Sequence, residues 1–478
     1  MGALSNNQKV FFELLRTGLW GDIPVQGEGF RVFGQAKRQS RAIDSLLSDV
    51  DWNEVYQLAQ EQSVQGLVLQ GIETVQGSSQ SSDASGAWLK VHGSSHSEAA
   101  ARPLVACKAR KPSAPLVPKV LLLQWIGEVQ VIEQQNKEMN AFVAELIEKL
   151  RKNDADALLV KGQGVAQCYE KPLWRCSGDV DLFLSDSNYE IAKRVLVPLA
   201  SEVETEYVGS KHLGMTIDGW VVELHGSLRV GLPNKINRVL DDIKTDTFNR
   251  GNMRSWMNGR TQVFLLGKEN DIVYVFVHFF NHFYKEGVGL RQLCDWCRLM
   301  WTYRDEIDVE KIEGRIQEMG LVSEWKAFYA LASRYLGMPD LGSQDSQARA
   351  QPKGMLDLSR MSDQRSSARL TDVESAMPRQ SSNKFGSAHG SIAELMVHDS
   401  RFDKKADRIM EFILKSGNMG HNRDMSHFSK YPYLIRKCVS MGRRIGDLIN
   451  HARIFPLDSL RIFPRIMFNG VRSAMRGE

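Results

Sequence analysis

The 478-residue chain is poor in the features that mark several special classes of protein. It has six cysteines without the regular spacing of a disulfide framework, which suits a reducing compartment. The most apolar window, residues 271–284, is too short and too polar to cross a bilayer. The net charge of +4 is too small for this length to indicate, by itself, a nucleic-acid partner.

The N-terminus lacks the basic segment and apolar stretch of a secretory signal, so we expect a cytoplasmic protein without a transmembrane segment. With 42% hydrophobic and 25% charged residues, the composition is that of a soluble globular protein. Residues 77–117 and 342–392 are rich in small and polar residues and have few large apolar ones. Such segments cannot offset the entropy of ordering, and we interpret both as low-complexity insertions.

The remaining sequence separates into helical and mixed regions. We predict an N-terminal helical region at 1–76, a mixed core at 118–265, a helical region at 266–341 and a basic C-terminal helical region at 393–478. In the first, apolar residues at helical spacing predict helix from residue 52, with Asp51 as its N-cap. The predicted fold class is α+β, a small mixed sheet with flanking helices.

The stretch RCSGDVDLFL places two carboxylates in an otherwise apolar run that is typical of a buried strand. Because side chains alternate along a strand, Asp179 and Asp181 share one face, and the valine and leucines share the other. Paired carboxylates repel each other, and a divalent cation such as Mg²⁺ relieves that repulsion. The alternative is an exposed edge strand whose polar residues face water, although Asp is a poor strand former.

A β-hairpin is predicted further along, where HLGMTIDGWVVELHGSL has alternating runs on both sides of Asp218-Gly219. An Asp-Gly pair in this position is a strong hairpin signal, because the turn requires positive φ. The second strand carries Glu223 and His225 on one face. Three carboxylates on neighbouring strands suit a phosphoryl-transfer site with two cations. His225 could lie near the metal, but a hydrogen-bonded core histidine is the favoured alternative.

These residues resemble a known family. The segment LLVKGQGVAQCYEKPLWRCSGDVDLFL, followed by VVELHGSL, is similar to the uncharacterised bacterial nucleotidyltransferase family of the polymerase-beta-like superfamily. Residues 278–301 and 415–424 also look like this family, and the resemblance covers most of the chain outside the two insertions. The family pattern Lys-Gly, Tyr, Arg and Gly-Asp-x-Asp is matched, in order, by Lys161, Gly162, Tyr169, Arg175, Gly178, Asp179 and Asp181.

The resemblance implies a nucleotidyltransferase that moves a nucleoside monophosphate from a nucleoside triphosphate to an acceptor, releases pyrophosphate and uses Mg²⁺ or Mn²⁺. The implied catalytic, metal-binding residues are Asp179, Asp181 and Glu223. The implied nucleotide-binding residues are Lys161, Gly162, Gly164, Arg175 and Gly178. The sequence departs from the superfamily in two places: Gly162-Gln163-Gly164 stands where Gly-Ser or Gly-Gly is common, and the third acid is Glu223 instead of Asp.

Nothing in the sequence identifies the acceptor or the nucleotide. The alternative function is a catalytically inactive nucleotide-binding or interaction protein on the same fold, although such a protein would not need the third acid. A nucleic-acid-binding module is a more distant alternative, which strongly salt-dependent affinity for RNA would support. Instead of binding phosphates, Lys161 and Arg175 could form ion pairs with Asp179 or Glu223, or lie at a solvated rim. For Tyr169, packing is favoured over base stacking.

Several other signals admit a functional and a structural interpretation. His278 and His282 share a helix face that could bind a metal, but helix packing is favoured. The motif of Cys294 and Cys297 falls inside a predicted helix, which favours buried thiols over a redox pair. The basic segment from residue 430 could contact an acidic acceptor, RNA or a membrane surface, and a helical cap on the core is the favoured alternative. Arg291 and Asp295, on the same predicted helix as the cysteines, resemble family positions and could contact the cleft.

Overall fold

The structure is a computed structural model of the chain. It describes residues 4–21, 47, 49–80, 116–206, 211–285, 287–339, 341, 395–418 and 432–476. The predicted insertion at 342–392 lies outside the described residues, as does most of the one at 77–117. At the edges of the latter, residues 77–80 continue a helix, and the side chain of Val117 is fully buried.

The described strands form one mixed sheet with the order β3-β4-β5-β2-β1-β7-β6. The β1–β7 and β2–β5 pairs are parallel, and the other neighbours are antiparallel. The sheet is therefore mixed, as predicted, but its seven strands make it larger than the small sheet we expected. The strand bounds are β1 Ala157–Val160, β2 Val180–Leu184, β3 Glu202–Val203, β4 His212–Ile217, β5 Trp220–His225, β6 Met253–Asn258 and β7 Thr261–Leu266.

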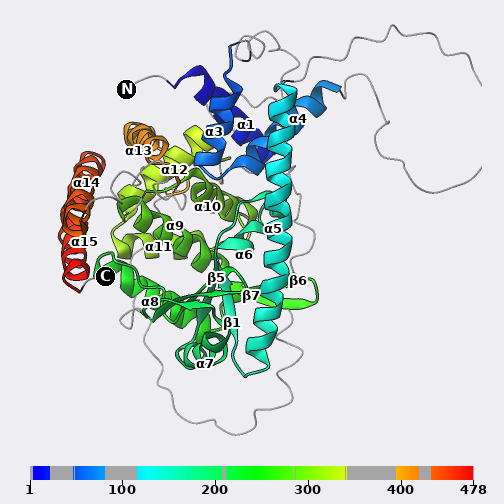
Figure 1. Cartoon of the computed structure of the whole chain (residues 1–478). Coiled ribbons are helices and arrows are strands. Elements are labelled where there is room, and N and C mark those ends of the chain that lie inside the picture. Colours follow the sequence, from blue (N-terminus) through cyan, green and yellow to red (C-terminus); the bar gives the residue numbers. More distant parts are fainter. Residues whose placement is uncertain are drawn as a thin grey trace, which may run out of the picture.

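Helices account for most of the remaining described chain (Figure 1). Before the sheet region come α1 Asn6–Trp20, α3 Trp52–Glu61, α4 Gln65–Gln80 and α5 Lys119–Arg151. Among and after the strands lie α6 Gly162–Ala166, α7 Asp186–Leu196, α8 Asn234–Phe248, α9 Lys268–Lys285, α10 Leu290–Thr302, α11 Val309–Met319 and α12 Val322–Leu336. The C-terminal helices are α13 Asp403–Ser416, α14 Tyr433–Ile454 and α15 Pro456–Arg476.

The two faces of the sheet pack against different helices. Val180, Leu182 and Leu184 of β2 are buried on one face, in a cluster with α7 and the C-terminal half of α5. Phe183 is buried on the other face, in the larger cluster that contains the N-terminal helices, α8, α9, α10 and α12. The long helix α5 runs from the N-terminal helices to the sheet and contributes to both clusters (Figure 1). All four predicted regions share the larger cluster, while their exact boundaries stay predictions.

Local signals in the sequence account for several element boundaries. The Asp51 side chain accepts hydrogen bonds from the backbone N–H groups of Asn53 and Glu54 and caps α3, as predicted. The single apolar pattern that follows is nevertheless two helices, because the chain turns at Ser63, where φ is +55°. The Asp218-Gly219 hairpin is confirmed, with φ of +50° and +82° at its two turn residues.

The C-terminal helices pack on the rest of the molecule. Helix α14 contacts α9, α13 and α15, which is consistent with the helical cap that we favoured. The same helices also carry exposed apolar side chains, among them Ile449, Leu460 and Phe468. Binding of an acidic acceptor, RNA or a membrane surface by this region stays a prediction. No helix in the described part of the chain is long and apolar enough to cross a membrane.

A buried carboxyl group lies where α15 meets α12. Glu324 of α12 is fully buried, and burial together with the neighbouring carboxyl of Asp458 raises the pKa of Glu324 to about 9. Its ordinary value is 4.5, so the folded state binds this proton more tightly than the unfolded state does. The resulting stabilisation is fully present below the unfolded pKa and is lost as the pH rises through the folded pKa.

We therefore expect Glu324→Gln to raise the melting temperature at pH 8 and to change it little at pH 5, because the amide needs no proton to remain neutral. Thermal unfolding of both proteins between pH 5 and pH 9 measures this difference. Glu318→Gln, at an exposed position of α11, is the control and should follow the wild-type curve. Parallel pH profiles for wild type and Glu324→Gln would contradict the prediction.

Candidate active site

The structure brings the three predicted acidic residues together on one face of the sheet. Strands β2 and β5 are parallel neighbours in which Asp181 lies opposite Glu223, and Asp179 immediately precedes β2. One carboxylate oxygen from each of the three residues lies within 4.8 Å of the others. Asp181 is 1% exposed, whereas Asp179 and Glu223 are only partly buried. A cation from solvent could therefore reach the cluster from the side of Asp179.

A cavity of about 320 Å³ lies over these carboxylates, between the sheet and helices α9 and α10. Val275, His278 and His282 of α9 line it. The sheet side and α10 supply Lys161, Gly162, Val165, Arg175, Gly178, Asp179, Asp181, Glu223, Arg291, Gln292 and Asp295. The cleft thus combines a carboxylate cluster with several basic side chains, and Arg291 and Asp295 do reach it.

Lys161 sits at the end of β1 in a backbone conformation that favours glycine, with φ of +59° and ψ of −147°. Its ammonium nitrogen lies 2.8 Å from Oδ1 of Asp181, and the side chain is 14% exposed. Burial disfavours the ammonium charge, but the charge of Asp181 raises the pKa of Lys161 well above its usual value. Lys161 therefore carries a fixed positive charge at the wall of the cavity, paired with Asp181 and not with Asp179 or Glu223.

Arg175 has a different partner from those the sequence suggested. Its guanidinium donates from Nε and Nη2 to the two oxygens of Asp295, at 2.7 Å each. Its Nη1 donates to the Cys176 carbonyl and the Ser177 hydroxyl, which leaves one of the five N–H groups for a ligand. This ion pair connects α10 to the segment that leads into β2. A role of Arg175 in binding nucleotide phosphates stays a prediction.

Tyr169 contacts the same carboxylate. Its hydroxyl donates to Oδ1 of Asp295 at 2.8 Å, and the residue is 6% exposed. Burial and the negative charge of Asp295 hold the pKa of the phenol well above its usual value. Tyr169 is thus a packed, hydrogen-bonded residue, in agreement with the favoured structural interpretation.

The three predicted nucleotide-binding glycines lie in different surroundings. Gly162, with φ of +42°, and Gly178 line the cavity. Gly164 is not among the lining residues. A Cβ added at Gly164 would lie 2.7 Å from a methyl group of Leu265, so packing of α6 against β7 accounts for glycine at this position. A phosphate-binding role for Gly164 stays a prediction.

Two of the site carboxylates have opposite pKa shifts. The negative charge of Asp181, together with burial, raises the pKa of Asp179. Burial also disfavours the charge of Glu223, but hydrogen bonds from His212 and His225 hold the pKa of that carboxyl well below its usual range. Burial opposes the charged form of His225, yet hydrogen bonds to Asp181 and Glu223 raise its pKa. The charges of the cluster thus act on one another, and the carboxylates lie against the cationic groups Lys161 and His225.

Sequence reasoning missed or undervalued several residues in the cavity or beside its carboxylates. His212, at the start of β4, was not considered, although its Nε2 lies 3.1 Å from Oε2 of Glu223. The register of the hairpin could have revealed it, because His212 pairs directly with His225. His278 and His282 were interpreted as packing residues, yet both line the cavity, with ring centroids 4.5 Å apart. Burial and the positive charge of Lys161 hold the pKa of His278 well below its usual value.

The cysteines of α10 do not line the cavity. Cys294 and Cys297 are buried free thiols within the helix. Burial raises the pKa of both thiols, and a protonated thiol is a poor nucleophile. This agrees with the interpretation of buried thiols.

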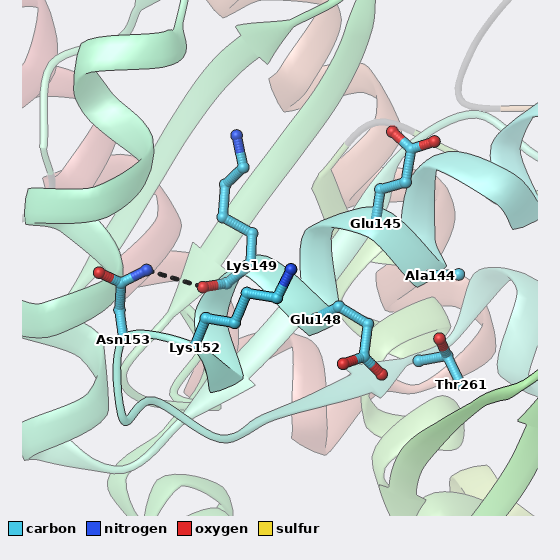
Figure 2. Close-up of a pocket in the computed structure, with 7 residues that line it drawn as sticks. All are labelled: Ala144, Glu145, Glu148, Lys149, Lys152, Asn153 and Thr261. Atoms are coloured by element: carbon cyan, nitrogen blue, oxygen red, sulfur yellow. Dashed lines mark hydrogen bonds between the residues drawn. The ribbon is translucent and has the colours of Figure 1, made fainter.

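A second depression lies elsewhere, along the C-terminal turns of α5 beside Thr261 (Figure 2). Its volume is about 390 Å³, and its charged lining residues are Glu145, Glu148, Lys149 and Lys152. Figure 2 shows these side chains spread along the helix without converging on one point, and the amide of Asn153 donates to the Lys149 carbonyl. The depression has the character of a polar helix surface and offers no set of catalytic groups.

Comparison with known protein families identifies the class. Residues 48–337, more than half of the chain, match the family described as uncharacterised nucleotidyltransferase. The chain therefore belongs to this nucleotidyltransferase family. The matched region includes every residue that lines the cavity between the sheet and helices α9 and α10. Comparisons with curated proteins and with solved structures gave no match.

Proposed function

We propose that the protein is a metal-dependent nucleotidyltransferase of the polymerase-beta-like type, acting on a nucleoside triphosphate with Mg²⁺ or Mn²⁺. The observation that supports this most strongly is the convergence of Asp179, Asp181 and Glu223 at the floor of an accessible cavity that also contains basic side chains. The reaction is attack of an acceptor hydroxyl or phosphate on the α-phosphate of the triphosphate, with release of pyrophosphate.

The donor set fits the proposed cation. Mg²⁺ prefers oxygen ligands and uses one or two carboxylates together with substrate phosphates and water. Asp179, Asp181 and Glu223 supply such oxygens within 4.8 Å of one another, and the partly exposed Asp179 leaves room for a phosphate and water. When bound, the cation would neutralise charge on the phosphate and favour ionisation of the attacking hydroxyl.

The protein groups around the cluster suit the remaining tasks. Lys161 and Arg291 line the cavity and can neutralise phosphate charge. Arg291 donates from Nη1 to the Cys176 carbonyl, and its Nε has no hydrogen-bond acceptor within the described part of the chain. We therefore assign to Arg291 the phosphate contact that the sequence suggested for Arg175. Helices α9 and α10 cover the carboxylates and limit the access of water, which strengthens electrostatic interactions in the cleft.

The rival function is a protein of the same fold that binds nucleotide without catalysis. It requires a nucleotide pocket but not three convergent carboxylates, because clustered carboxylates repel one another and a triphosphate unless a cation is bound. The presence of all three acids favours the enzyme. We propose no particular class of acceptor.

The test is a transfer screen. Purified protein is incubated with Mg²⁺ or Mn²⁺, each nucleoside triphosphate labelled at the α-phosphate, and a cell extract as the source of acceptors. The expected result is label in a new product with at least one nucleotide, accompanied by pyrophosphate release and abolished by chelation of the metal. Metal-dependent nucleotide binding without any labelled product would favour the inactive binding protein instead.

A further inference from the structure

A second group of ligand atoms lies beside the three carboxylates. The β4–β5 hairpin places His212 directly opposite His225, and Glu223 lies two residues before His225 on the same strand face. Oε2 of Glu223 is 3.1 Å from Nε2 of His212 and 3.3 Å from Nε2 of His225. These ligand atoms all lie within 4.8 Å of one another. Glu223 thus belongs to an oxygen-only group on one side and to a group with two imidazoles on the other.

The spacing and chemistry of this second group match a transition-metal site. A tetrahedral zinc ion with ligands at 2.0–2.1 Å separates neighbouring ligand atoms by about 3.3 Å. The two measured separations from Oε2 of Glu223 are close to that value without any rearrangement. Imidazole nitrogens favour zinc, copper, iron or nickel, whereas magnesium prefers carboxylate and water oxygens. Two histidines and one glutamate, with a remaining position for water or substrate, are a known zinc ligand set.

Hydrogen bonds alone account poorly for the position of His225. Its Nε2 faces two carboxylates, at 2.8 Å from Oδ1 of Asp181 and 3.3 Å from Oε2 of Glu223. A ring nitrogen carries at most one hydrogen and cannot donate a strong bond to both oxygens. A cation bound by Nε2 of His225 and Oε2 of Glu223 would account for the approach of these two atoms.

We propose that His212, His225 and Glu223 form a binding site for a zinc-like transition-metal dication, distinct in its ligand chemistry from the carboxylate site for Mg²⁺. Because Glu223 is common to both groups, occupancy of one site changes the charge that the other cation meets. The proposal does not depend on nucleotidyl transfer, since metal binding is measured without nucleotide.

Titration with Co²⁺, a coloured substitute for Zn²⁺, tests the proposal directly. The wild-type protein should bind one equivalent with the visible absorption of a nitrogen-ligated, low-symmetry site. Loss of outer-shell partners alone costs about 10–100-fold in metal affinity, so His212→Gln should weaken binding by at least about a hundredfold. His278→Gln is the matched control, because His278 lines the cavity together with Glu223 but belongs to neither ligand group. Equal Co²⁺ affinity and absorption in wild type and His212→Gln would overturn the proposal.

X-ray absorption of the wild-type protein with one equivalent of Zn²⁺ removes dependence on how the variants fold. Scattering from two imidazoles is expected, and a shell of oxygen ligands alone would refute the site. Asp179→Asn separates this proposal from the proposed enzyme. It should retain the Co²⁺ absorption, because Asp179 is not in the histidine group. A chain that binds Co²⁺ as expected but transfers no nucleotide would leave the metal site standing and would contradict only the enzyme.

Discussion

Asp179→Asn is expected to reduce nucleotidyl transfer by about a thousandfold or more, because loss of metal-held transition-state stabilisation costs several kcal/mol. The melting temperature of this variant should equal or exceed that of the wild type. The charge of Asp181 and burial raise the pKa of Asp179, so the folded protein disfavours ionised Asp179, and at neutral pH an uncharged amide removes that penalty. Transfer of labelled nucleotide and thermal unfolding of the same preparation measure the two effects.

Asp181→Asn provides the contrast. Asp181 is 1% exposed and accepts contacts at 2.8 Å from both Lys161 and His225. Its neutralisation leaves the charge of Lys161 without its partner, and breaking such a buried pair is destabilising. This variant should therefore lose both activity and stability. An Asp179→Asn protein that transfers nucleotide at the wild-type rate would contradict the assignment of Asp179 to the catalytic cluster.

Much of the carboxylate cluster could be predicted because it depends on local patterns. Strand alternation fixes which face Asp181 and Glu223 occupy, and the Asp218-Gly219 turn fixes the register that places His212 beside His225. We assumed from the chemistry of the site that β2 and β5 are neighbours. The parallel pairing of Asp181 with Glu223 confirms that assumption. The catalytic roles of these residues stay predictions.

Other features depended on a signal that we did not use or on contacts distant in sequence. The β6–β7 hairpin turns at Gly259-Arg260, with φ of +62° at the glycine, and recognising this glycine turn would have predicted the larger sheet. The partner of Arg175 could not be found in this way, because Asp295 lies 120 residues further along the chain. Local periodicity gives the face of a helix but not which distant segment packs against it.

The buried pair of Arg175 and Asp295 leads to the second large expected effect. Asp295→Ala should lower the free energy of unfolding by about 3–5 kcal/mol, because it leaves the guanidinium of Arg175 buried without a counter-charge. The Tyr169 hydroxyl loses its acceptor in the same variant. Chemical denaturation measures the change. The exposed pair of Arg229 and Asp241 offers a matched control, since Asp241→Ala should cost no more than about 1 kcal/mol.

The double variant Arg175→Met with Asp295→Leu separates the stabilising role of this pair from a role in nucleotide binding. Replacing a buried ion pair by apolar side chains of similar size is often neutral, so most of the lost stability should return. A refolded double variant whose KM for nucleotide equals that of the wild type would show that Arg175 positions the segment before β2 and does not bind phosphate. A KM raised at restored stability would instead support the phosphate contact that the sequence suggested. An Asp295→Ala protein as stable as the wild type would contradict the ion pair itself, because leaving a buried guanidinium without its partner lowers the free energy of unfolding.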